Sequence, residues 1–152
     1  MKRTPISERV LPNYTRGEEI ANMTTHIVGG AIGVILLFLT VIISAFKRDA
    51  WGIVGSAIYG VSMIALYTVS SVYHGLKPGF AKKVMQVIDH STIYLLIVGT
   101  YTPILLVAMR PVYPALAWTV FAAEWILAGV AATFTAIDHN KYKKLSMVFY
   151  IL

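Results

Sequence analysis

Four long apolar runs, separated by short polar segments, dominate the chain. They cover approximately residues 27–46, 51–73, 84–109 and 113–137. A helix of about 20 apolar residues crosses the roughly 30 Å hydrocarbon core of a bilayer. A fifth apolar segment starts near residue 145 and continues to the last residue. The pattern predicts an all-α integral membrane protein, a multi-span helix bundle with four full spans and the start of a fifth.

The segment before the first run is polar and differs from a secretory signal. Residues 1–17 contain Pro5, Pro12 and four basic residues, and no apolar run follows closely enough to form the core of a signal peptide. We interpret residues 1–17 as a short cytoplasmic tail. Residues 18–152 then form one transmembrane domain.

Composition and charge agree with a membrane protein. Hydrophobic residues make up 57% of the 152 positions and charged residues 13%, against about a quarter charged in soluble domains. There is no cysteine, so a metal site would need histidine and carboxylate ligands. A net charge of +6 would suggest nucleic acid for a soluble protein. Here the placement of the charges explains it better, and we expect no nucleic-acid partner.

The basic residues concentrate in alternate connections between the spans. The tail and residues 77–83 and 138–144 hold all lysines and arginines except Lys47, Arg48 and Arg110. The positive-inside rule therefore places the N-terminus and these connections in the cytoplasm, in a multi-pass protein of the cell membrane.

Candidate chemistry lies where the second span ends and the third begins. Ser70 and His74 are four residues apart, so a helix presents both on one face. Asp89 is expected to begin the next helix, where a carboxylate suits the helix dipole. Simpler interpretations stay open: His74 could bond to headgroups or water, Ser70 to its own helix backbone, and Asp89 could only cap its helix.

Further polar residues precede the first span. Asn22 and His26 are four residues apart and either join the same cluster or fix helix packing. Glu19 is either an accessory to this cluster or a solvated charge at a helix start. His90 points about 100° away from Asp89 on a helix and is expected to be peripheral.

Two residues interrupt the apolar spans near their middle. Pro103 cannot donate a hydrogen bond to the Gly99 carbonyl, so a kink is expected there. Glu124 lies near the middle of the fourth span, where a carboxylate is costly and usually has a partner or faces a cavity. Glu124 is expected either to be neutral or to bond to Thr100, Thr102 or the carbonyl freed by Pro103.

Four motifs together resemble the hemolysin III family. They are Glu-Glu-x-x-Asn-x-x-x-His before the first span, Ser-x-x-x-His ending the second, Asp-His-Ser opening the third, and Gly-Thr-Tyr-Thr-Pro within the third. The resemblance runs from about Glu18 to the end of the sequence. The family is related to the progestin and adipoQ receptors and to alkaline ceramidases, and has seven helices. The resemblance therefore implies a chain truncated at its C-terminus, with five helices begun.

The resemblance also implies a zinc ion near the cytoplasmic surface. It implies His74 as a ligand, Asp89 as the holder of the water on the metal, and Ser70 in support. Two further ligands come from a His-x-x-x-His motif in the family's seventh helix, which this sequence lacks. Zinc lowers the pKa of a bound water toward about 7, and a nearby carboxylate can accept its proton.

The activity that the resemblance implies is hydrolysis of a lipid amide, whose tail stays in the bilayer. The site would be incomplete in this chain, and this fragment would be inactive. Two other classes of function remain open: a pore-forming, cytolytic membrane protein, as the family name suggests, and a receptor or sensor without turnover.

The charge distribution predicts the topology. Reporter fusions at Lys82 and Arg110 should report opposite sides of the membrane, with Lys82 in the cytoplasm, because the positive charge gathers at the connection that contains Lys82. An external reporter at Lys82 would contradict both the orientation and a site at the cytoplasmic leaflet.

Overall fold

The computed structural model describes residues 4–151, without the side chains of residues 139, 140, 143 and 151. The described chain is almost entirely helical, in the order η1 (Ile6–Glu8), α1 (Arg16–Phe46), α2 (Ala50–Gly75), α3 (Phe80–Pro103), η2 (Ile104–Met109) and α4 (Pro114–Ile151). Four helices are long and apolar enough to cross a membrane. The expected all-α membrane fold is therefore confirmed.

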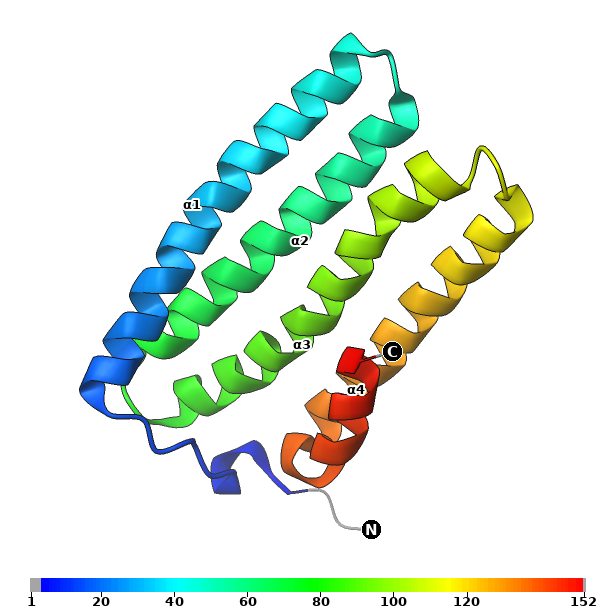
Figure 1. The fold of residues 1–152 in the computed structure, drawn as a ribbon. Helices are drawn as coiled ribbons and strands as arrows, with labels where there is room; N and C mark the ends of the chain where they lie inside the picture. The colour runs from blue at the N-terminus through cyan, green and yellow to red at the C-terminus, as the bar shows by residue number, and fades with distance from the viewer. Residues whose placement is uncertain (1–3, 152) are drawn as a thin grey trace.

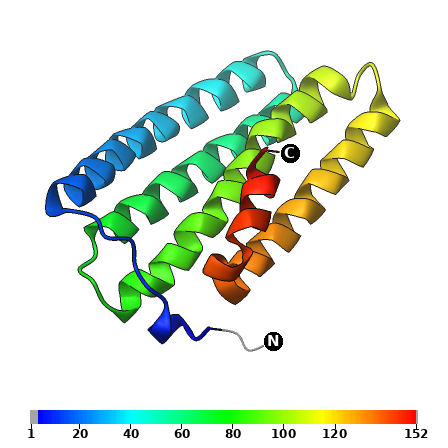
Figure 2. The ribbon, with the colours of Figure 1, turned by 60° about the horizontal axis from the view of Figure 1, so that its bottom comes forward.

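The four spans lie side by side in the order of the sequence (Figures 1 and 2). Among the described residues, each span packs only against its neighbours in the chain: α1 on α2, α2 on α3, and α3 on α4. The spans thus form an open layer, with α1 and α4 as its edges. Because consecutive spans run in opposite directions, α1 begins, α2 ends and α3 begins at the same end of the layer.

The helix α4 consists of two arms that meet at Asp138. The backbone of Asp138 is extended, with φ −163° and ψ 95°, and the second arm folds back along the layer (red in Figure 2). In this arm Tyr150 stacks on Tyr94 of α3, with ring centroids 4.9 Å apart. Tyr94 Oη lies 3.1 Å from Thr135 Oγ1 in the first arm. The expected start of a fifth helix is this returning arm.

The kink expected at Pro103 takes the form of a change in helix type. The six residues after it form the π-helical stretch η2, and the Arg110 backbone N–H donates to the Leu105 carbonyl at 2.8 Å. A wider turn is a common response to an interrupted hydrogen-bond ladder. Pro103 packs closely on α2, because a Cβ added to Gly55 would lie 2.9 Å from Pro103 Cα.

The N-terminal segment packs across one end of the layer, from α1 toward the bend in α4 (Figure 1). Arg9 is buried, and its Nη2 donates to the carbonyls of Ala136 and Ile137 at 3.2 and 2.7 Å. The Thr4 backbone N–H donates to Asp138 Oδ2 at 3.2 Å. Arg9 thus holds the N-terminal segment against the end of the first arm of α4.

We expect Arg9→Ala to lower the free energy of unfolding of the purified protein by about 2 kcal/mol, because two charge-assisted hydrogen bonds are lost. Thermal unfolding in detergent measures the effect. Lys47→Ala, at an exposed position in the turn at the other end of the layer, is the matched control. Equal effects of the two substitutions would contradict a specific role for Arg9.

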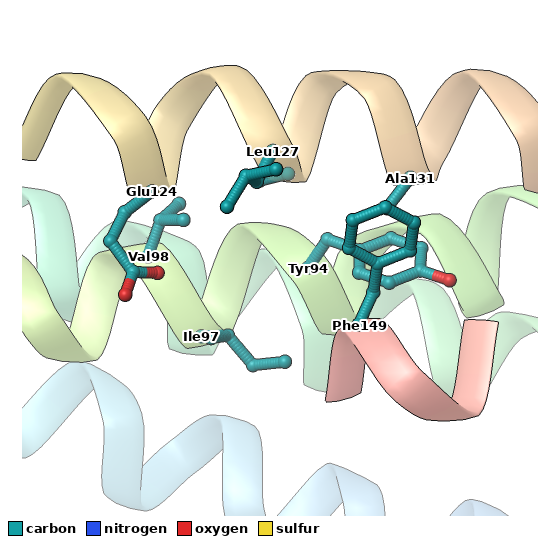
Figure 3. Close-up of a pocket in the computed structure, with 8 residues that line it drawn as sticks. Tyr94, Ile97, Val98, Glu124, Leu127, Ala131 and Phe149 are labelled. Carbon is teal, nitrogen blue, oxygen red and sulfur yellow. The ribbon is translucent and has the colours of Figure 1, made fainter. Parts of the chain in front are cut away.

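Glu124 projects from α4 toward α3 (Figure 3). It does not form the expected hydrogen bond with a threonine, since Thr100 and Thr102 donate to carbonyls of their own helix at 2.8 and 2.6 Å. A helical threonine reaches these carbonyls without moving any other group. Among the described residues, the Glu124 carboxyl has no hydrogen-bond partner. It faces a cavity of about 50 Å³, lined also by Tyr94, Ile97, Val98, Leu127, Ala128, Ala131 and Phe149.

We therefore expect Glu124→Leu to raise the unfolding temperature of this 152-residue chain in detergent, because an unpaired carboxylate is removed from apolar surroundings. Glu124→Gln should have a smaller effect, since the amide is also polar. A lower unfolding temperature for Glu124→Leu would show that Glu124 has a partner outside the described residues.

Candidate functional site

The start of α1 brings an acidic side chain to the polar end of the layer. Thr15 caps the helix: its Oγ1 accepts the Glu18 N–H at 3.3 Å, and its own N–H donates to Glu18 Oε2 at 2.7 Å. This reciprocal capping is a strong helix start signal. It begins α1 at Arg16, well before the apolar run. Glu19 therefore lies in the first turn, beside α2 and α3.

Glu19 joins all three helices at this end. Its Oε2 lies 2.7 Å from His74 Nδ1, and its Oε1 accepts a hydrogen bond from Lys82 Nζ at 2.6 Å. His74 is in the last turn of α2 and Lys82 in the first turn of α3. A partly buried carboxylate with two such partners recovers much of its lost hydration. Glu19 is thus part of the polar cluster and not only a charge at a helix start.

Lys82 is buried, with 3% of its surface exposed. Besides Glu19, its ammonium donates to the Leu76 carbonyl at 3.0 Å and lies 5.1 Å from the centre of the Tyr73 ring. Lysine is seldom buried unless it is paired, and here a carboxylate, a carbonyl and an aromatic face surround it. Lys82 therefore fixes the start of α3 against the end of α2.

The imidazole of His74 is held by aromatic rings as well as by Glu19. It meets the ring of Tyr73 at 4.8 Å and that of Tyr14 at 5.7 Å between centroids. The ring of His26 lies edge-on to it, 5.7 Å away at an interplanar angle of 76°. His74 is consequently fixed in orientation through Nδ1 and its ring surroundings.

Two buried polar atoms in the cluster lack a hydrogen-bond partner among the described residues. They are His26 Nδ1 and Tyr73 Oη. Buried polar groups in proteins are nearly always bonded, so these atoms mark the place where a water molecule, ion or ligand would be stabilised. Asp89 is close enough to both side chains to interact with them electrostatically.

Asp89 does not begin its helix, as the sequence had suggested. The helix α3 starts at Phe80, after Gly79, so Asp89 lies in its third turn and cannot be its N-cap. The hydropathy pattern missed the first turn because it contains Lys82 and another lysine. His90 Nδ1–H donates to the Gln86 carbonyl of its own helix at 2.7 Å.

The remaining candidates are placed differently. Ser70 is buried but makes no hydrogen bond with the described residues, whereas the neighbouring Ser71 donates to its own helix backbone. Asn22 lies on α1 between Glu19 and His26, and its side chain likewise has no hydrogen bond within the described part of the chain. Glu124 belongs to another region, roughly 20 Å along α4 from the polar end.

A cleft of about 670 Å³ opens beside the cluster, at the membrane-surface end of α1 and α2. Its lining combines charged, aromatic and apolar side chains from the start of α1, the end of α2 and the connection to α3. The lining residues are Tyr14, Arg16, Glu19, Ile20, Met23, His74, Gly75, Leu76, Lys77, Pro78 and Lys82.

The donor set fits the implied zinc ion only in part. His74 is an oriented imidazole, and His26 Nδ1 is an unpartnered nitrogen nearby. However, the described residues contain no group of three histidine or carboxylate side chains that could hold a metal ion, and tight zinc sites use at least three protein ligands. These residues therefore do not fit a tightly held zinc ion on their own.

His74, His26 and Asp89 were candidates from the sequence, whereas Lys82, which bonds to Glu19 beside His74, was not. A lysine in a basic connection is normally solvated. Lys82 is the third residue of α3, and the first turn of α1 is acidic. This pairing of charges could have indicated Lys82, but only if the starts of both helices had been known.

Comparison with known proteins gives consistent matches. Residues 14–152 match the family described as Haemolysin-III related. The chain is 37% identical to Hemolysin-3 of Bacillus cereus over 135 residues (89% of this chain, 60% of the relative). It is 37% identical to the Hemolysin-3 homolog of Bacillus subtilis over 139 residues (91% and 64%). Similarity extends to the human Monocyte to macrophage differentiation factor, 28% identical over 160 residues (98% and 61%).

The chain spans about 60% of the length of these relatives. No solved structure gives a significant match. The family match nevertheless covers almost the whole sequence, and the four apolar helices agree with a protein embedded in a lipid bilayer. The chain therefore belongs to the Haemolysin-III related family of membrane proteins.

Proposed function

We propose that this chain carries the His74 part of a zinc-hydrolase-type site at the cytoplasmic leaflet. The substrate is a lipid amide, and the remaining metal ligands come from outside the described residues. The observation that carries the proposal is the 2.7 Å contact between Glu19 Oε2 and His74 Nδ1.

The Glu19–His74 contact matches the chemistry of a metal-binding histidine. Such histidines usually donate the second ring N–H to a carboxylate, which fixes the ring and raises its basicity as a ligand. Glu19 orients His74 in this way and leaves Nε2 for a metal. Zinc in such a site polarises a carbonyl and activates a water molecule. Asp89, one helix away, can hold a proton at its carboxylate.

The position of the site suits a lipid substrate. The cleft lies where three membrane helices meet their connecting segments, so a polar headgroup can enter while its acyl chain stays among apolar side chains. Other functions fit less well. The described helices form an open layer and not a ring, so a pore would need other chains or segments. A receptor or sensor would bind ligand at this cleft without hydrolysing it.

Zinc content tests the proposal. We expect the purified 152-residue chain to hold clearly less than one zinc per molecule and to hydrolyse no lipid amide. A chimera that adds the part of the Bacillus cereus relative outside the matched region should hold about one zinc. In the chimera, His74→Ala should abolish zinc binding, and Glu19→Gln should weaken it about 10–100-fold by removing the group that orients the ligand. Elemental analysis measures the zinc content of each protein, and zinc titration measures the affinity.

Glu124→Gln is the matched control for Glu19→Gln, because Glu124 lies roughly 20 Å along α4 from the polar end, and it should leave zinc binding unchanged. A chimera without zinc, or one whose zinc is insensitive to His74→Ala, would refute the proposal. Stoichiometric zinc in the short chain, removed by His74→Ala, would instead show a site built within this chain, with His26 as the first residue to test.

A further inference from the structure

The 670 Å³ cleft has an excess of positive charge. Arg16, Lys77 and Lys82 line it, with Glu19 as the single carboxylate among the lining residues. Glu19 is already engaged by Lys82 and His74. The cations of the lining therefore outnumber its anions even when His74 is neutral.

Two of these cations are free to bind a ligand. Arg16 and Lys77 are exposed, and neither forms an ion pair or hydrogen bond with the described residues. They line the cleft from two elements, the first turn of α1 and the connection after α2. Arginine and lysine from two elements that face one opening are the usual means of holding a phosphate.

Apolar side chains lie next to the basic residues of the cleft, as a lipid with a charged headgroup and an acyl chain requires. Ile20, Met23 and Leu76 contribute apolar lining beside the cations, and about half of the Ile20 surface is exposed. A second groove, of about 300 Å³, lies between the same two helices and starts at His26, one helical turn beyond Met23. Its lining is mainly apolar, so a basic cleft and an apolar groove follow each other along α1 and α2.

We propose that this cleft binds an anionic phospholipid of the adjoining leaflet, with Arg16 and Lys77 on the headgroup phosphate and an acyl chain in the groove between α1 and α2. Basic residues next to a membrane span attract anionic lipids in this way. The proposal does not depend on metal binding, since neither Arg16 nor Lys77 belongs to the donor set for zinc.

Lipid titration of the purified protein tests the proposal. The probe is dioleoylphosphatidylglycerol, added to protein in neutral detergent with a chelator present, and the readout is the shift in unfolding temperature with lipid concentration. We expect the anionic lipid to stabilise the protein and dioleoylphosphatidylcholine to do so far less. The double variant Arg16→Gln/Lys77→Gln should bind the anionic lipid about 10–30-fold more weakly. Each basic residue near an anionic membrane surface strengthens binding about fivefold, and the variant removes two.

The matched control is Lys47→Gln/Arg48→Gln, which removes the same charge from exposed positions at the other end of the layer and should retain full affinity. Equal losses in the two double variants would overturn the proposal, because general charge attraction would then explain binding. Equal stabilisation by phosphatidylcholine would overturn it as well. Inorganic phosphate at the same concentration should have no effect, and stabilisation equal to that by the lipid would assign the cleft to a soluble anion instead. The chelator keeps all these outcomes independent of zinc.

Discussion

One carboxylate determines how the polar end of this protein is assembled. Glu19 is the only described group that contacts α2 and α3 from α1 through both of its oxygens, with His74 at 2.7 Å and Lys82 at 2.6 Å. Each partner would be costly to bury alone: Lys82 because of its charge, and His74 because its second nitrogen would lack a partner. Sharing the carboxylate allows both to be buried, and the cleft, the fixed imidazole and the start of α3 all depend on it.

The fold class was predictable because hydropathy reports membrane burial directly. The ends of the helices were less predictable, for reasons visible in two elements. α1 starts at Arg16 because Thr15 and Glu18 cap it, and α3 starts at Phe80 although lysines occupy its first turn. Both starts lie outside the apolar runs. Asp89 was therefore placed at a helix start when it lies in the third turn.

The candidate site was predictable in its residue types more than in its contacts. His74 and His26 were candidates from their four-residue spacing to Ser70 and Asn22, and Asp89 from its expected position and the family resemblance. The Glu19–Lys82 pair joins positions 63 residues apart and leaves no local pattern. For Glu124 the sequence suggested a contact between helices that the described residues do not form. The cost of a carboxylate in the membrane suggested a partner, yet the nearby threonines bond to their own helix at no cost in conformation. Whether a polar residue bonds locally or across helices depends on packing that hydropathy does not encode.

The open layer ties the chemistry of the site to the attachment of α1. Within the part of the chain that the structure describes, this helix packs along its length on α2 alone. A short turn joins the two at one end, and Glu19 holds α1 to both α2 and α3 at the other. By thermodynamic linkage, a group that competes for Glu19 loosens the edge helix, and a group that binds better while Glu19 keeps both partners tightens it. In each case the attachment of α1 changes the affinity for that group by the same free energy. Occupancy of the cleft and attachment of the edge helix α1 are therefore two sides of one equilibrium.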